Sequence, residues 1–151
     1  MLPKDFFAKY AAAAIATCKG TGLLVSVTLA QAALESGWGE SKLAKLGLNF
    51  GGIKAGKSWK GKRLNFKTQE EVNKQLITIT DDFRAYPTAE AYFADRVLLF
   101  RTLSRYKALF AQDSYKAESM LFTKTGYCTD TSYGPKLISI IEKHGLTKYD
   151  A

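Results

Sequence analysis

Residues 25–41 read VSVTLAQAALESGWGES, an apolar run that ends in one glutamate and a tryptophan between two glycines. At 100° per residue, Glu35 falls on the same side of a helix as Thr28 and Gln31, while valine, leucine and alanine cover most of the remaining circumference. A helix that is apolar nearly all round is usually buried, and a glutamate is rarely buried without a partner. The stretch therefore predicts a buried helix over about Val25–Ser36, with a single polar seam that faces a partner or a cleft.

The role of Glu35 is open at this level. A carboxylate at the end of a buried polar seam is equally suited to a structural hydrogen bond or ion pair and to a catalytic cleft, because structural ion pairs also place carboxylates near cores.

Length and composition predict one domain over residues 1–151. A chain of 151 residues with 46% apolar residues can bury a core without disulfides. The net charge of +8, from 22 basic and 14 acidic side chains, favours an anionic partner. No predicted helix gathers arginine and lysine on one face beside stacking aromatics, so we expect no nucleic-acid binding.

The sequence shows no membrane span and no metal-ligand cluster. Its longest apolar run, YAAAAIATC, is far shorter than the roughly 20 residues of a span, and we assign it to the first helix rather than to a signal peptide. Export would then need a leader absent from this chain or release by another route. Cys18, Cys128 and His144 are too few and too scattered for a metal site. A disulfide between the two cysteines stays open, and His144 suits the carbonyl end of the last helix.

Periodicity predicts a mostly α (α+β) fold, a helical body with one small β excursion. The segments KRLNFKT and KQLITITDDFRAY alternate apolar with polar residues and predict two short strands, with QEEVN between or beside them. The resulting β-lobe covers approximately residues 57–86. Helices are expected over residues 3–19, 25–36, part of 40–47, 88–103 with Thr88 as cap, 114–124, and a last one that ends near His144.

The segment LAQAALESGWGES closely resembles the catalytic segment of family 73 glycoside hydrolases, the bacterial and phage peptidoglycan N-acetylglucosaminidases. The resemblance continues through NFGGIKA, KTQE, FRAY and TGYCTDTSYGPKL, in the family's order and over almost the whole chain. It implies a lysozyme-like helical body with a small β-hairpin lobe, and hydrolysis without a cofactor of the β-1,4 bond after N-acetylglucosamine in the peptidoglycan glycan strand. It also implies action at the bacterial cell wall, in the periplasm or outside the cell. We expect a monomer that its charge draws to an anionic cell-wall polymer.

Three residues match the family's catalytic positions. Glu35 matches the general acid, and an apolar setting would help such a group to keep its proton. Glu70 matches the second carboxylate, in the pattern T-x-E, as the base that activates water; the adjacent Glu71 leaves open which of the two faces the cleft. Tyr133 matches a tyrosine near the acid. The N-acetyl oxygen of the substrate is an alternative nucleophile to a second carboxylate.

Five further residues are candidate substrate contacts. Gln31 lies on the polar seam, Asn49 and Lys54 match the family segment N-x-F-G-I-K, and Tyr127 matches the first tyrosine of the TGYCTDTSYGPKL segment. Trp38 is either a wall of the cleft or a core residue, and the core is favoured because buried aromatics are far commoner than sugar platforms.

The sequence departs from the family pattern at two places. Phe50 stands one position early in NFGGIK, where we expect it to pack rather than to contact substrate. Pro135 lies in the last helix, where an interior proline is costly, so we expect that helix to start late with Ser132 as its N-cap.

Other activities remain possible on the same fold. These are a muramidase, a lytic transglycosylase and a catalytically inactive wall-binding module. The reducing-end sugar of released fragments separates the enzymes, and the intact ESGWG segment argues against an inactive module.

Overall fold

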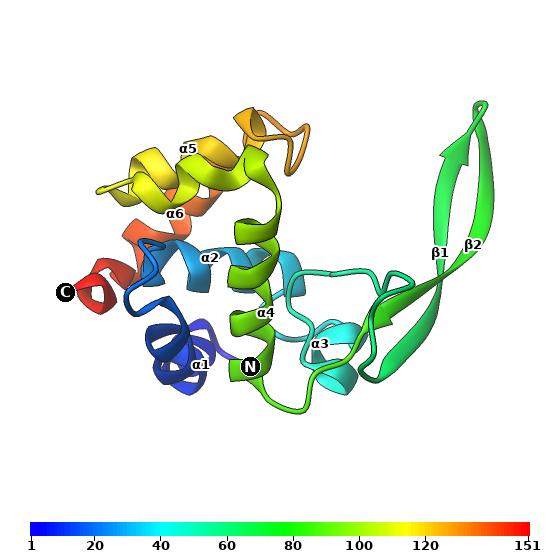
Figure 1. Ribbon diagram of the computed structural model, residues 1–151, viewed down its shortest axis with the longest axis horizontal. Coiled ribbons are helices and arrows are strands. Elements are labelled where there is room, and N and C mark those ends of the chain that lie inside the picture. The colour runs from blue at the N-terminus through cyan, green and yellow to red at the C-terminus, as the bar shows by residue number, and fades with distance from the viewer.

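A helical body and a projecting two-stranded hairpin make up the computed structural model of this chain (Figure 1). The structure describes residues 1–151 apart from the side chains of residues 68–70. The elements are α1 (Pro3–Cys18), α2 (Val25–Ser36), α3 (Lys42–Gly47), β1 (Arg63–Val72), β2 (Gln75–Arg84), α4 (Ala89–Thr102), the 3-10 helix η1 (Ser104–Ala111), α5 (Tyr115–Lys124), α6 (Tyr133–His144) and the 3-10 helix η2 (Leu146–Asp150). The predicted fold class is confirmed, and the two 3-10 helices were not predicted.

Helix α2 is the buried centre of the body, as its sequence predicts. All of its residues except Leu34 and Glu35 are buried. It packs against α1, α6 and η2, and α4 crosses in front of it in Figure 1. Because alanines such as Ala30 and Ala33 have no exposed surface, neighbouring helices approach the α2 backbone closely. Apolar burial of this kind stabilises a fold by about 25 cal/mol per Å².

A cluster of aromatic rings joins α1, the segment after α3, and α4. Phe50 lies at its centre and contacts the rings of Tyr10 at 4.8 Å, Tyr92 at 5.3 Å and Phe6 at 6.0 Å between centroids. These pairs are edge-to-face, the arrangement that ring quadrupoles favour. The expected packing role of Phe50 is therefore confirmed.

The hairpin is longer than the sequence suggested. Its antiparallel register runs from Arg63↔Arg84 to Val72↔Gln75, so the segment QEEV continues β1 instead of linking two short strands. Asn73 and Lys74 close the turn with φ values of 51° and 63°. A two-residue turn with positive φ at both positions matches the right-handed twist of the strands, which lets the pairing continue to the tip.

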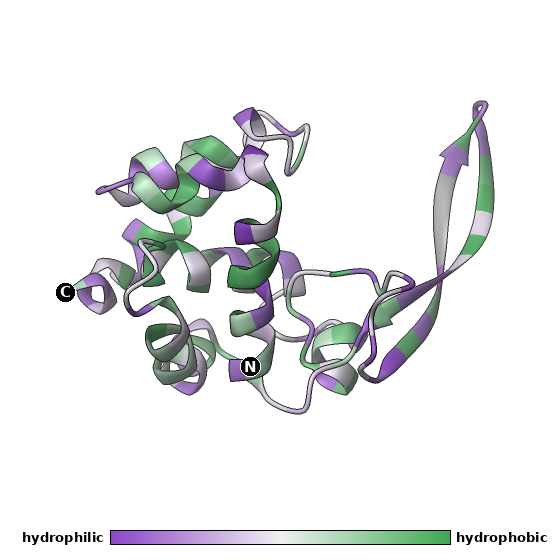
Figure 2. Ribbon diagram, in the orientation of Figure 1, coloured by the Kyte–Doolittle hydropathy of each residue, from purple (hydrophilic) through white to green (hydrophobic). Residues whose placement is uncertain are grey.

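The hairpin also differs from the body in burial. Figure 1 shows it extending away from the helices, and hydrophobic and hydrophilic residues are interspersed along the coloured part of its ribbon, which no other element covers (Figure 2). Leu76 and Ile77 near the tip are 68% and 40% exposed. The hairpin therefore has no core of its own.

Helix starts are set by side-chain caps at two predicted sites. The hydroxyls of Thr88 and Ser114 accept hydrogen bonds from the backbone N–H groups three residues later, as N-caps do. Ser132 is the N-cap residue of α6, as predicted, but it makes no side-chain cap bond, and its hydroxyl donates to Asp130 instead. Pro135 sits in the first turn of α6, where a backbone N–H is not needed.

The two cysteines are unpaired, and His144 packs against an aromatic ring. Cys18 and Cys128 are free thiols, and Cys18 is buried 3.4 Å from the hydroxyl of Thr28. His144 ends α6 at the expected place, and its ring packs against Phe7. In the part of the chain that the structure describes, every helix is too short or too polar to cross a membrane.

Candidate active site

Glu35 stands in the last turn of α2, where the chain turns sharply away. Gly37, Trp38 and Gly39 all have left-handed backbone, with φ of 57°, 61° and 82°. A Cβ on Gly39 would lie 3.2 Å from the ring of Phe6, so this position requires glycine for both conformation and space. The turn leaves Glu35 exposed at the end of a buried helix. The expected apolar setting for Glu35 is therefore wrong, because the helix ends before neighbours can cover the side chain.

Tyr133 is the hydrogen-bond partner of Glu35. Its hydroxyl donates to Glu35 Oε1 at 2.8 Å, although the two residues are 98 positions apart in the sequence. Burial raises the pKa of Tyr133 above its usual range, and the nearby Tyr127 and Glu35 raise it further. The phenol therefore stays protonated and acts as a donor. The structure brings together the two residues that the family resemblance placed near each other.

A buried arginine is the partner of the polar seam of α2. Arg96 on α4 is 2% exposed. Its Nε donates to Gln31 Oε1 at 2.7 Å, and its Nη1 donates to Thr28 Oγ1 at 3.0 Å. Gln31 Nε2 in turn donates to the hydroxyl of Tyr133 at 3.1 Å. The seam thus faces a partner at Thr28 and Gln31, and it opens to solvent at Glu35.

A cleft of about 480 Å³ lies beside this hydrogen-bond chain, between α4, η1 and residues 51–54. Gln31, Lys54 and Tyr127 line it, together with Arg96. Glu35 follows Gln31 by one helical turn on the same face of α2, so it lies next to Gln31 but outside the lining of the cleft itself. Three of the five predicted substrate contacts therefore lie along one cleft.

Asn49 does not present its amide to this cleft. The side chain is 1% exposed, and its nitrogen donates to the carbonyl oxygens of Ile53 and Arg84, both at 2.9 Å. Its oxygen accepts from the N–H of Ile53 at 3.0 Å. The predicted substrate contact is thus wrong in this structure, because every polar atom of the side chain braces the loop that carries Lys54.

Trp38 packs on the core. Its ring lies 5.5 Å from that of Phe7, 6.4 Å from that of Phe6 and 5.3 Å from that of His144. It is absent from the lining of the cleft. These contacts support the core interpretation of Trp38 and not the substrate-binding one.

The candidates for the second carboxylate lie on the hairpin. Glu70 is outside the residues whose side chains the structure describes. Glu71 is exposed and pairs with Leu76, one pair short of the turn. The tip of the hairpin points away from the helical body (Figure 1), so Glu71 is remote from the helix that carries Glu35.

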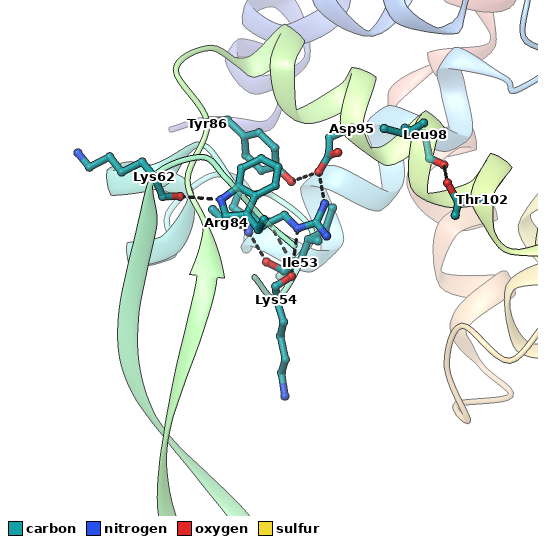
Figure 3. Close-up of polar contacts among 10 residues, drawn as sticks. Ile53, Lys54, Lys62, Arg84, Tyr86, Asp95, Leu98 and Thr102 are labelled. Carbon is teal, nitrogen blue, oxygen red and sulfur yellow. Dashed lines mark hydrogen bonds and ion pairs between the residues drawn. The ribbon is translucent and has the colours of Figure 1, made fainter. Parts of the chain in front are cut away.

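Arg84 ties the base of the hairpin to α4 (Figure 3). Its Nη1 donates to Asp95 Oδ2 at 2.8 Å, its Nε donates to the carbonyl of Lys54 at 3.1 Å, and its guanidinium lies 4.7 Å from the ring of Trp59. The Tyr86 hydroxyl donates to the same Asp95 oxygen at 2.6 Å. These contacts fix the base of the hairpin on the wall of the cleft.

The cleft continues past this base. A cavity of about 410 Å³ shares Arg84, Leu99 and Leu103 with the cleft. It shares Trp59 and other residues with a larger, apolar cavity of about 620 Å³ beside α3. The three cavities thus adjoin one another through shared lining residues, and we call their series along α4 the trough.

Sequence reasoning missed Arg96, and a signal for it exists. Tyr92, Phe93, Val97 and Phe100 recur at three- and four-residue spacing around Arg96, which puts the arginine on the buried face of α4. A buried cation needs hydrogen-bond acceptors, and the polar seam of α2 supplies them. Arg84 and Asp95 carry no comparable local signal. Among the described residues, no three histidine, cysteine or acidic side chains gather in a way that could hold a metal ion.

The chain is similar to known cell-wall hydrolases. The sequence profile of the glucosaminidase family, described as mannosyl-glycoprotein endo-beta-N-acetylglucosaminidase, matches residues 11–146. The exo-glucosaminidase LytG of Bacillus subtilis (strain 168) is 36% identical over 133 residues, covering 85% of this chain and 46% of LytG. The peptidoglycan hydrolase FlgJ of Salmonella typhimurium is 32% identical over 144 residues, covering 93% of this chain and 46% of FlgJ.

A solved structure has the same fold. The catalytic domain of the autolysin Auto from Listeria monocytogenes superposes with a TM-score of 0.87 at 32% identity, covering 98% of this chain and 87% of that one. The chain spans about half the length of LytG and of FlgJ. From the profile match and the shared fold we conclude that the chain belongs to the glucosaminidase family, family 73 of the glycoside hydrolases.

Proposed function

We propose that this chain hydrolyses the β-1,4 bond after N-acetylglucosamine in the glycan strand of peptidoglycan, at the bacterial cell wall. The observation that carries the proposal is the bond from Tyr133 to Glu35, which lies one helical turn beyond Gln31, a residue in the lining of a cleft. Membership of the family supports the reaction type, and relatives named exo-glucosaminidase and peptidoglycan hydrolase support the substrate.

Glu35 is the general acid of the proposed reaction. It donates its proton to the departing glycosidic oxygen while the bond from that oxygen to the sugar's anomeric carbon breaks. The hydroxyl of Tyr133 then stabilises the carboxylate that is left. Because Glu35 is exposed in the free protein, the bound glycan must itself exclude water from the carboxyl.

The second half of the reaction has two candidate routes. A carboxylate of the hairpin, Glu70 by the family pattern, activates water once the hairpin approaches the cleft. Alternatively, the N-acetyl oxygen of the substrate attacks the anomeric carbon and no second carboxylate is required. The remote position of the neighbouring Glu71 in this structure favours the second route unless the hairpin moves.

The trough and the surface charge suit a long anionic polymer. A trough of three connected cavities can hold several sugar units. At its edge, the described Lys57, Lys60 and Lys62 are exposed and form no ion pair with another described residue. We infer that these lysines attract the wall, and that the domain acts as a monomer in the periplasm or outside the cell.

Digestion of purified sacculi tests the proposal. Released fragments should carry N-acetylglucosamine at their new reducing ends when analysed by mass spectrometry. Reducing-end N-acetylmuramic acid would instead indicate a muramidase, and an anhydro sugar would indicate a lytic transglycosylase. No release from sacculi would leave only a wall-binding role.

A further inference from the structure

We infer that Arg96 is a positioning residue for the proposed reaction, because it fixes the direction of the hydrogen-bond chain that ends on Glu35. The inference rests on the proposed role of Glu35 as the acid. It concerns a residue in the lining of the cleft that is only 2% exposed, and it assigns a task to a buried arginine.

Arg96 is a buried hydrogen-bond donor with fixed partners. It is 2% exposed, its Nε and Nη1 donate to Gln31 and Thr28, and its guanidinium lies 4.8 Å from the ring centroid of Phe100. A guanidinium has five N–H donors and no acceptor. The group that faces its Nε must therefore be an acceptor.

This requirement determines which group donates and which accepts in each later hydrogen bond, from Gln31 through Tyr133 to Glu35. The amide oxygen of Gln31 must face Arg96, so its NH₂ group faces the hydroxyl of Tyr133 at 3.1 Å. A flipped amide would place its N–H groups against those of the guanidinium. The hydroxyl oxygen of Tyr133 accepts from Gln31, which leaves its proton for Glu35 Oε1 at 2.8 Å.

As a consequence, the two carboxyl oxygens of Glu35 have different roles. Oε1 accepts from Tyr133, so the transferable proton resides on Oε2. When Oε2 gives this proton to the glycosidic oxygen, the carboxylate that forms already has a donor in place. Such a preorganised donor costs no reorganisation at the moment of reaction.

The other side of Arg96 does not compete for these bonds. Glu118 on α5 is fully buried, and burial raises its pKa to about 8, so it is mostly protonated at neutral pH. Its Oε1 accepts from the N–H of Leu24. Within the described part of the chain no hydrogen bond joins Glu118 to Arg96, and both hydrogen bonds of the guanidinium go to acceptors on α2.

Replacement of Arg96 by lysine tests the inference. A lysine keeps the charge but cannot reproduce the fork that meets two acceptors. We expect kcat on sacculi to fall about 10- to 100-fold, by analogy with the outer-shell partners that orient metal ligands, with KM nearly unchanged. Arg101→Lys, the same substitution five residues along α4, is the matched control and should leave kcat unchanged. An Arg96→Lys enzyme with wild-type kcat would overturn the inference.

A double-mutant cycle separates positioning from mere packing. If Arg96 acts through Tyr133, Arg96→Lys should cost no further kcat in a Tyr133→Phe background. A packing defect would instead lower kcat by the same factor in both backgrounds. That result would refute an action of Arg96 through the hydrogen bonds of Gln31 and Tyr133. Where Arg96→Lys does not fold, Gln31→Met removes the middle link and enters the same cycle, with the same expected non-additivity.

A readout without turnover separates this inference from the proposed function. With tyrosine labelled at ¹³Cζ, the Tyr133 resonance should shift in Arg96→Lys and stay in place in Arg101→Lys. If the wild-type chain releases no glycan fragments, the proposed function fails while this resonance still tests the chain. An unchanged Tyr133 resonance in a folded Arg96→Lys variant would overturn the inference even if the enzyme is active.

Discussion

The helical body and the hairpin differ in how they are stabilised: the body by burial, the hairpin by pairing between its strands. In the body, α2 is enclosed on nearly all sides, and the polar groups of its seam find partners in Arg96 and Tyr133. The hairpin has long, well-paired strands but no covering layer (Figure 2). Two strands alone are marginally stable in water, and here the base is held by hydrogen bonds that include those of Arg84 and Tyr86 to Asp95 and of Arg84 to the carbonyl of Lys54. The contrast teaches that changes in the body should affect stability, whereas changes in the hairpin should affect only function.

Glu35→Gln gives the largest expected effect and tests an exception to that contrast. Glu35 belongs to the body but is exposed, so its replacement should leave the thermal midpoint nearly unchanged. Turnover on sacculi should fall about 100- to 10,000-fold, because glutamine cannot donate the proton. Lysis assays with purified variant measure this, and a variant that clears walls at a near wild-type rate would refute the assignment.

A pair of leucine truncations measures the contrast directly. Leu29 in α2 has no exposed surface, and Leu76 in the hairpin is 68% exposed. Leu29→Ala should lower the free energy of unfolding by about 2–5 kcal/mol, and Leu76→Ala by less than about 0.5 kcal/mol. Urea denaturation of both variants is the measurement. Similar losses would mean that the hairpin tip packs on the body in solution.

A pair of glutamate substitutions tests the hairpin's chemical role. Adjacent strand residues point to opposite faces, so only one of Glu70 and Glu71 can face the cleft. If the carboxylate route operates, Glu70→Gln should lower activity about 100-fold or more, and Glu71→Gln only slightly, with the thermal midpoint unchanged in both. Sensitivity of Glu71 would shift the family register by one residue. Two harmless substitutions would favour attack by the N-acetyl group of the substrate.

The buried Glu118 should give the body a pH dependence that the hairpin lacks. Burial raises the pKa of Glu118 from 4.5 to about 8, so the folded state holds this proton more tightly than the unfolded chain. Its contribution to stability is fully present below about pH 4.5 and is lost as pH rises to about 8, by at most about 1.4 kcal/mol per pH unit.

Denaturation at several pH values checks this with Glu118→Gln as reference. The wild type should lose stability relative to the variant as pH rises through this window. His144, whose pKa is lowered by burial, acts in the opposite direction, but it is present in both proteins and cancels in the comparison. A constant difference between the two proteins would contradict the buried-carboxyl account.

Salt should give the smallest effect, confined to the basic edge at the base of the hairpin. Activity on sacculi should fall several-fold with added salt, because the Debye length is only about 8 Å near physiological ionic strength. Activity on a short neutral chitooligosaccharide, if it is cleaved, should change little. Replacement of Lys57, Lys60 and Lys62 by glutamine should weaken the salt dependence on sacculi. Equal salt dependence on both substrates would exclude recruitment by charge.

Local patterns predicted the elements of the body because each pattern is completed within a few residues. The enclosure of α2 follows from apolar residues on all of its sides, and the starts of α4 and α5 follow from the hydroxyls of Thr88 and Ser114. The family segments likewise placed Glu35 and Tyr133 correctly as neighbours. The length of the hairpin escaped prediction, because the mostly polar segment QEEVN gives no alternation signal although backbone pairing continues through QEEV to the turn at Asn73 and Lys74.

Contacts between distant segments could not be predicted, because no local pattern encodes them. Gln31 and Tyr133 meet across 102 residues, and Arg96 reaches Gln31 across 65. The same holds for Asn49, whose amide is fully engaged only once Arg84 arrives from β2. Residue types in the sequence therefore specified which groups were available for chemistry. Packing of α4 and α6 against α2 specified which groups meet, because the direction of a hydrogen bond depends on the partner that the fold supplies.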